Sequence, residues 1–94
     1  PNILADGTRI RVREASNYKF IAVSRNLLKR FGGFLDYGDW ILLRGTSHKD
    51  GVYQVRDTMN KRFVNRIDIL ESEHIKPYMF PKAEIVKLTW TAAE

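Results

Sequence analysis

The chain of 94 residues is long enough for one compact domain and too short for two, so we expect one small core with any site on its rim. Sixteen Lys and Arg against eleven Asp and Glu give a formal net charge of +5, which favours polyanionic partners such as nucleic acid, anionic lipid or acidic wall polymers. The absence of cysteine excludes disulfides, thiol catalysis and thiolate metal sites, and no apolar run approaches the ~20 residues that a membrane-spanning helix requires.

The first third of the chain predicts a short strand, a buried strand and one helix. Residues 8–12 follow a turn signal and are expected to form the short strand. The apolar run at 20–23 predicts a buried strand, and Ser24 is placed to cap a helix over 25–31. Gly32-Gly33 is expected to end that helix. The side chains that the helix would bury are Leu27, Leu28 and Phe31.

The remainder of the chain alternates between strand and turn patterns. Strands are expected at 40–43 and 52–56, joined as a hairpin by a polar loop. Two more are expected at 66–70 and 83–90, the last with Val86, Leu88 and Trp90 on one face. About six short strands with one short helix predict a mainly β single domain over residues 1–94, closed into a small barrel because closure removes exposed sheet edges.

Two aspartates stand in apolar strand patterns, where Asp is normally rare. Asp57 shares a strand face with Tyr53 and Val55, and Asp68 lies between Ile67 and Ile69. An acid in such a position either accepts hydrogen bonds from backbone N–H groups or serves a functional site. The residues alone leave both interpretations open.

A longer pattern contains these two aspartates. Residues 51–69 read Gly-Val-Tyr-Gln-Val-Arg-Asp-Thr-Met-Asn-Lys-Arg-Phe-Val-Asn-Arg-Ile-Asp-Ile, and this run resembles the signature of the three-aspartate (3D) domains and of rare lipoprotein A. In those families an Ile-Asp-hydrophobic strand follows the first Asp by the spacing that separates Asp57 from Asp68. Ala5-Asp6-Gly7, the segment at 21–24 and the segment at 37–43 are also similar, so the resemblance covers roughly residues 5–70. Ser24 stands where the 3D domains have another Asp.

The resemblance implies a fold and an activity. The fold would be a six-stranded double-psi β-barrel, expected here to lack its first strand or to borrow one, because relatives carry a strand before the segment matched by Ala5. The activity would be that of the membrane-bound lytic transglycosylase A-like enzymes, with Asp68 as general acid/base and Asp57 beside it. These enzymes cleave peptidoglycan between N-acetylmuramic acid and N-acetylglucosamine and form a 1,6-anhydro product. No metal or cofactor is implied, and the location would be the periplasm or cell envelope, with the export signal outside this chain.

Further residues are candidates for binding the glycan. We expect Asp39, Asp57 and Asp68 to share one shallow groove, with Tyr37 offering a flat face to sugar rings. Asn60 and Asn65, polar loop residues between two of the aspartates, are candidates for hydrogen bonds to N-acetyl or hydroxyl groups. His48 and His74 lack the spacing of a metal site.

The sequence does not decide whether Asp68 is protonated near neutral pH. Burial and the negative charge of Asp57 would raise its pKa, whereas Arg62 and Arg66 would lower it if they pointed inward. Two other functions stay open: a non-catalytic glycan-binding barrel in the manner of the expansins, and a basic barrel that binds nucleic acid or another protein, which we consider the weaker alternative.

Overall fold

The computed structural model of the chain describes residues 3–72, 75–76 and 78–89. This part is mainly β, as predicted, and it contains five strands and three short 3₁₀ helices but no long helix. The elements in chain order are η1 (Val12–Asn17), β1 (Phe20–Val23), η2 (Arg25–Leu27), η3 (Lys29–Phe31), β2 (Trp40–Arg44), β3 (Gly51–Thr58), β4 (Ile67–Ile69) and β5 (Glu84–Lys87).

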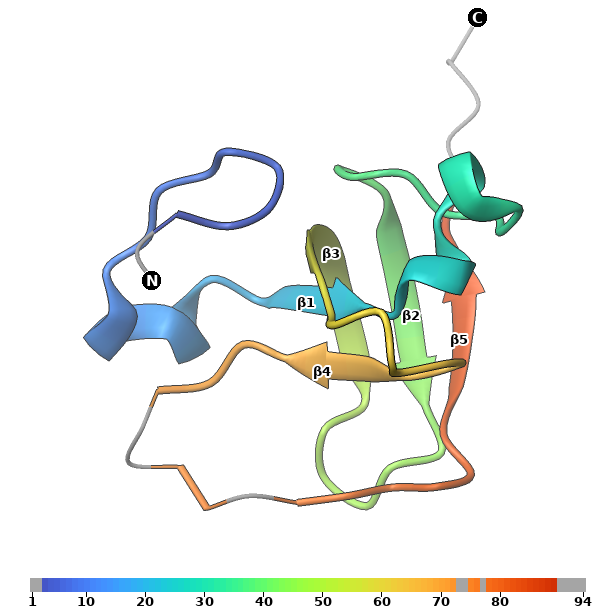
Figure 1. Cartoon of the computed structure of the whole chain (residues 1–94). Helices are drawn as coiled ribbons and strands as arrows, with labels where there is room; N and C mark the ends of the chain where they lie inside the picture. Colours follow the sequence, from blue (N-terminus) through green and yellow to red (C-terminus); the bar gives the residue numbers. More distant parts are fainter. Residues whose placement is uncertain (1–2, 73–74, 77, 90–94) are drawn as a thin grey trace, which may run out of the picture.

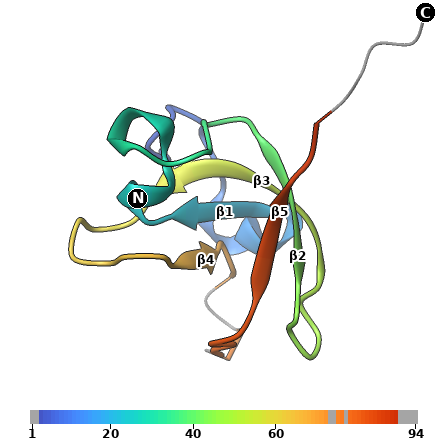
Figure 2. The ribbon, with the colours of Figure 1, turned by 90° about the vertical axis from the view of Figure 1, so that its right-hand side faces the viewer.

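All five strands belong to one sheet in the order β4-β1-β3-β2-β5. β1 pairs with β3 in parallel, whereas the other three pairings are antiparallel and include the predicted β2–β3 hairpin. The sheet curls into a half-barrel. In both views β1 and β4 run horizontally, whereas β2 and β5 run vertically (Figures 1 and 2). β4 and β5 are therefore the two edges of the curl.

The main core lies on the inner face of this sheet. Alternate residues of the three central strands are buried there, which is the period of two that a half-buried strand requires. The buried residues of this cluster are Ile21, Val23, Leu28, Leu35, Ile41, Leu43, Tyr53 and Val55, with Ile67, Ile69 and Ile85 packed against them. The edge strands thus close the core only in part.

The N-terminal segment covers the other face of β1. Leu4, Ile10 and Ala15 are buried there against Phe20 and Leu70. The strand predicted at 8–12 is wrong: only an isolated bridge between Ile3 and Arg9 forms, and η1 begins within the predicted range. No strand forms here because Ile10 packs into this small second cluster rather than into the sheet.

The helix predicted at 25–31 is also wrong, because two 3₁₀ turns replace it. Leu28, between η2 and η3, is extended, with φ of −84° and ψ of 141°, and forms a bridge with Leu35. Its side chain is 3% exposed, so burial in the core outweighs the helical preference of the segment. Phe31, which the helix was expected to bury, is 51% exposed. Gly32 does end the segment in the left-handed conformation at φ of 94°.

The predicted strands at 66–70 and 83–90 are shorter in the structure, at β4 and β5 respectively. Trp90, expected at the end of the last strand, lies outside the described residues. No helix in the described ranges is long and apolar enough to cross a membrane.

Candidate functional site

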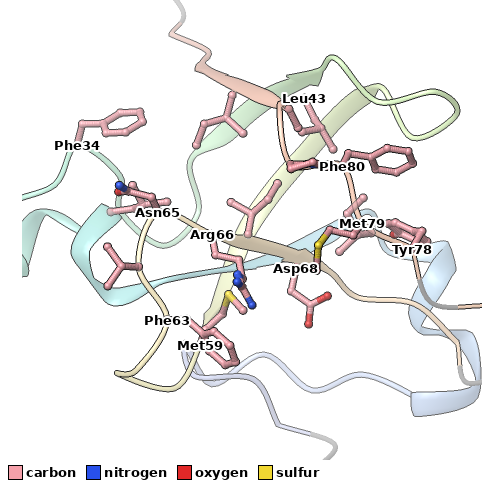
Figure 3. A pocket seen from close by; sticks show the side chains of 17 residues that line it. Phe34, Leu43, Met59, Phe63, Asn65, Arg66, Asp68, Tyr78, Met79 and Phe80 are labelled. Atoms are coloured by element: carbon pink, nitrogen blue, oxygen red, sulfur yellow. The ribbon is translucent and has the colours of Figure 1, made fainter.

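A groove of about 740 Å³ wraps around the edge strand β4. Its walls come from β4, from the loop before it, from β5 and from the segment 78–81, and they are mostly apolar (Figure 3). The four polar or charged side chains that contribute to its lining are Asn65, Arg66, Asp68 and Tyr78. A second cavity of about 460 Å³ lies next to it and shares Asp68, Ile69 and Tyr78 with the groove.

Asp68 stands at the junction of these two cavities. Its neighbours Ile67 and Ile69 turn inward and pack against the main core, so strand alternation directs Asp68 to the outer face. Its side chain is exposed. A carboxyl group in this position can reach a ligand in either cavity.

One residue of β1 separates Asp68 from Asp57. Ala22 is the register partner of Asp57 on β3 and of Asp68 on β4, so the two acids share a face, and their Cα atoms are two strand spacings, about 10 Å, apart. Asp57 does not share the face of Tyr53 and Val55 as expected, because the pairing of β1 with β3 shifts register between Ile21 and Ala22. The structure therefore brings the two predicted residues onto one surface.

The Asp57 carboxylate already has partners. Its Oδ1 accepts hydrogen bonds from the backbone N–H groups of Ala5 and Thr58, both at 2.9 Å. Asp57 thus holds the N-terminal segment against the end of β3, which is one of the two roles that the sequence left open. It does not line either of the two cavities described above.

The surroundings of Asp68 favour its protonated form. Although the side chain is exposed, the surrounding protein displaces part of its water, and this desolvation raises its pKa above the usual 3.8. The charge of Glu71 raises the pKa further, and Asp57 adds a smaller contribution. Neither Arg62 nor Arg66 forms an ion pair with Asp68 within the described part of the chain. The sequence could not decide whether the pKa of Asp68 is raised or lowered, and in the structure it is raised.

Glu71 is the residue of this site that sequence reasoning missed. Its carboxylate accepts hydrogen bonds from Lys49 Nζ at 2.7 Å, the Tyr78 hydroxyl at 2.6 Å and the Ser16 hydroxyl at 3.0 Å. Burial opposes its ionisation, but these three hydrogen bonds outweigh burial and lower the pKa of Glu71. Burial and the hydrogen bond to Glu71 in turn raise the pKa of Tyr78 far above its usual value. Glu71 is thus a fixed negative charge beside Asp68.

Asp39 and Tyr37 line neither cavity. The Asp39 carboxylate accepts a hydrogen bond from the Asp36 N–H at 2.8 Å and pairs with Lys87 Nζ at 3.3 Å, so it secures the start of β2. Tyr37 packs against the main core, and its buried hydroxyl has no hydrogen-bond partner among the described residues. The structure does not bring these two side chains to the groove around Asp68.

The two loop asparagines differ in their position. Asn60 Oδ1 accepts a hydrogen bond from the Arg62 N–H at 3.0 Å and shapes a turn, and Asn60 is not among the residues that line the groove. Asn65 lines the groove, and its side chain and backbone are both bonded to Asn26. Asn65 therefore lies in the groove, while its Oδ1 already accepts a hydrogen bond from Asn26.

No group of three or more His, Asp or Glu side chains that could hold a metal ion occurs in residues 3–72, 75–76 and 78–89. His48 packs edge-on against the rings of Tyr78 and Phe80. His74 lies outside the described residues.

Comparison with known proteins finds no matching family, no matching curated protein and no matching solved structure. The arrangement of Asp68, Glu71 and the two cavities is therefore the basis for any assignment. Chemically, the arrangement offers one solvent-accessible carboxylic acid that ionises reluctantly beside a carboxylate that stays ionised.

Proposed function

We propose that this domain cleaves the glycan strand of peptidoglycan as a lytic transglycosylase, with Asp68 as its single general acid/base. The observation that carries the proposal is the position of Asp68, exposed at the junction of two cavities with a raised pKa. A general acid works best when its pKa lies near the working pH, and the burial and negative charge around Asp68 act in that direction.

The proposed reaction needs one carboxyl group used twice. Protonated Asp68 donates its proton to the oxygen that links N-acetylmuramic acid to N-acetylglucosamine, and the bond from that oxygen to the muramic C1 breaks. The resulting carboxylate then accepts the proton of the muramic C6 hydroxyl as the C6 oxygen attacks C1. The products are a 1,6-anhydro sugar and a free N-acetylglucosamine 4-hydroxyl, and Asp68 is protonated again without water being consumed.

The same proposal extends to the fold and the location. We propose that the half-barrel represents a double-psi β-barrel whose sixth strand lies outside the described sheet. The similarity of residues 5–70 to the 3D domains supports this, as does the parallel pairing of β1 with β3 inside an otherwise antiparallel sheet. The periplasm or cell envelope is the proposed location, since the substrate is found there.

The test is incubation with purified peptidoglycan, followed by mass spectrometry for anhydro-muropeptides. Wild-type protein should release them, and Asp68→Asn should reduce the rate by about 10²–10⁴-fold because the amide cannot transfer the proton. Asp36→Asn is the matched control, since it removes an exposed carboxylate that pairs with Lys29 away from the groove. Equal release by wild type and the Asp68 variant would refute the enzymatic proposal.

A second candidate is a glycan-binding domain without catalysis, similar to the expansins. It is favoured by the Asp57 carboxylate, which is engaged by two backbone N–H groups and is not available to assist Asp68 directly. The mostly apolar groove lining is also suited to holding sugar faces. Retention of wild-type protein on insoluble peptidoglycan, without release of any anhydro product, would establish this candidate instead.

A further inference from the structure

The loop between β3 and β4 carries a cluster of positive charge next to the groove. Residues 59–66 include Lys61, Arg62 and Arg66 and contain no acid. The guanidinium carbons of Arg62 and Arg66 lie 4.7 and 4.8 Å from the centre of the Phe63 ring. Neither arginine has an acidic partner within 4 Å among the described residues. Two like charges thus share one aromatic ring, and the described part of the chain offers neither of them an acidic partner.

This loop is held in place by other parts of the chain. Asn26 Nδ2 donates to Asn65 Oδ1 at 2.6 Å, and the Asn65 N–H donates to Asn26 Oδ1 at 3.0 Å. These bonds keep Asn65 in the left-handed conformation at φ of 52°, which is unusual for a residue other than glycine. The fully buried Ser24 binds both the N–H and the carbonyl of Arg66. The loop therefore presents its arginines without having to fold around a ligand.

Arg66 lies two residues before Asp68 on the chain, and both side chains line the same groove (Figure 3). Met59, Phe63 and Val64 contribute apolar surface beside Arg66. A ligand that fits this end of the groove carries a negative group attached to an aliphatic portion. The planar guanidinium is well suited to a carboxylate, which it can bind through two parallel hydrogen bonds.

We propose that Arg62 and Arg66 bind a carboxylate of the short peptides attached to the glycan, so that the domain selects peptide-bearing glycan over bare glycan. This inference rests on the proposed function for the position of the glycan beside Asp68. A nucleic acid is the less suitable ligand, because Arg66 is the one cation among the described residues that line the groove, and a chain of phosphates would meet mostly apolar walls beyond it.

The first experiment compares two forms of the glycan. Binding to peptide-bearing glycan and to glycan stripped of peptides by an amidase is measured for wild type and for the double variant Arg62→Gln, Arg66→Gln. Wild type should prefer the peptide-bearing form by about 10- to 100-fold, the range for hydrogen bonds between charged groups. The double variant should lose this preference and bind the two forms of the glycan with equal affinity.

The matched control is Arg9→Gln, Arg11→Gln, which removes the same charge from exposed positions that line neither cavity. It should keep the wild-type preference, which separates a local carboxylate site from a general effect of net charge. Equal binding of both glycans by wild type, or equal losses in the two double variants, would refute the inference while leaving glycan cleavage untouched.

A second experiment does not depend on glycan. The Nε–H signals of Arg62 and Arg66 are followed by NMR during titration with a short acidic peptide and with the same peptide amidated at its carboxylates. Selective shifts with the acidic form support the site even if wild type neither binds nor cleaves glycan, in which case the proposed function alone fails. Absence of selective shifts overturns the inference, as does tighter binding of a single-stranded oligonucleotide through the same two arginines.

Discussion

At the scale of single residues, Asp68 carries a cost to folding that its proposed role explains. Its pKa in the folded protein is raised above 3.8 by burial, by Glu71 and by Asp57, so the ionised form is less favourable there than in the unfolded chain. Stability contributed by protonated Asp68 is complete below pH 3.8 and is lost as the pH rises through the folded-state pKa. Functional sites often retain such unfavourable groups.

We therefore expect Asp68→Asn to be more stable than wild type at pH 7, even though its activity is lost. The asparagine has no charge to desolvate and none for Glu71 to repel. Thermal denaturation across pH should show a higher melting temperature for the variant at pH 7 and convergence of the two proteins below pH 3.8. A lower melting temperature for the variant at neutral pH would contradict the raised pKa.

The neighbours of Asp68 should differ in their influence on it. Glu71→Gln is expected to lower the pKa of Asp68 more than Asp57→Asn does, because Glu71 exerts the larger repulsion and its loss also leaves Lys49 without its partner. Titration of the Asp68 carboxyl carbon by NMR measures both effects, with Asp36→Asn as a distant control. A larger decrease in the pKa of Asp68 with Asp57→Asn than with Glu71→Gln would show that Asp57 has the greater influence on it.

At the scale of elements, the segment between β1 and β2 shows how burial decides local structure. Leu28 and Leu35 are almost fully buried and face each other, and the backbone opens into two 3₁₀ turns to place Leu28 there. Leu28→Ala should cost about 2–5 kcal/mol of unfolding free energy, typical of a truncated core leucine. Phe31→Ala, in the neighbouring turn, should change it by less than about 0.5 kcal/mol because the ring is largely exposed. Urea denaturation of both variants tests the contrast, and equal losses would indicate a continuous helix that buries both.

Five strands could be predicted from the sequence, because β1 and β2 are continuous apolar runs and the other three carry apolar residues at alternate positions, and all five appear within a few residues of their expected bounds. The helix could not, because only the tertiary pairing of Leu28 with Leu35 interrupts it. Asp68 could be singled out as an acid inside an apolar strand. The role of Glu71 could not, since its partners Lys49 and Ser16 lie far away in the sequence and meet it only in the folded chain.

At the scale of the whole molecule, the half-barrel leaves β4 and β5 as edges that other chains could extend. A lysine protects one of them: Lys87 shares the inward face of β5 with Ile85 and pairs with Asp39. Lys87→Leu should increase self-association, measured by sedimentation velocity over a range of concentrations. Lys82→Leu adds a similar apolar side chain at an exposed turn and should not. A Lys87 variant that sediments as wild type does would show that this edge needs no charge for protection.

The position of β1 between β4 and β3 in this sheet also sets the order in which the molecule can assemble. Both of its neighbours are made later by the ribosome, β3 after an intervening hairpin strand and β4 later still, so Ile21 and Val23 have no sheet partner until Val55 and Thr58 of β3 are synthesised. Closing such distant pairs slows folding, because loop entropy is lost before the contacts are gained. The β2–β3 hairpin is local and can form first. The nascent chain therefore carries the apolar run 20–23 without a strand partner until β3 has been made, and during that interval the unpaired run is most prone to aggregation.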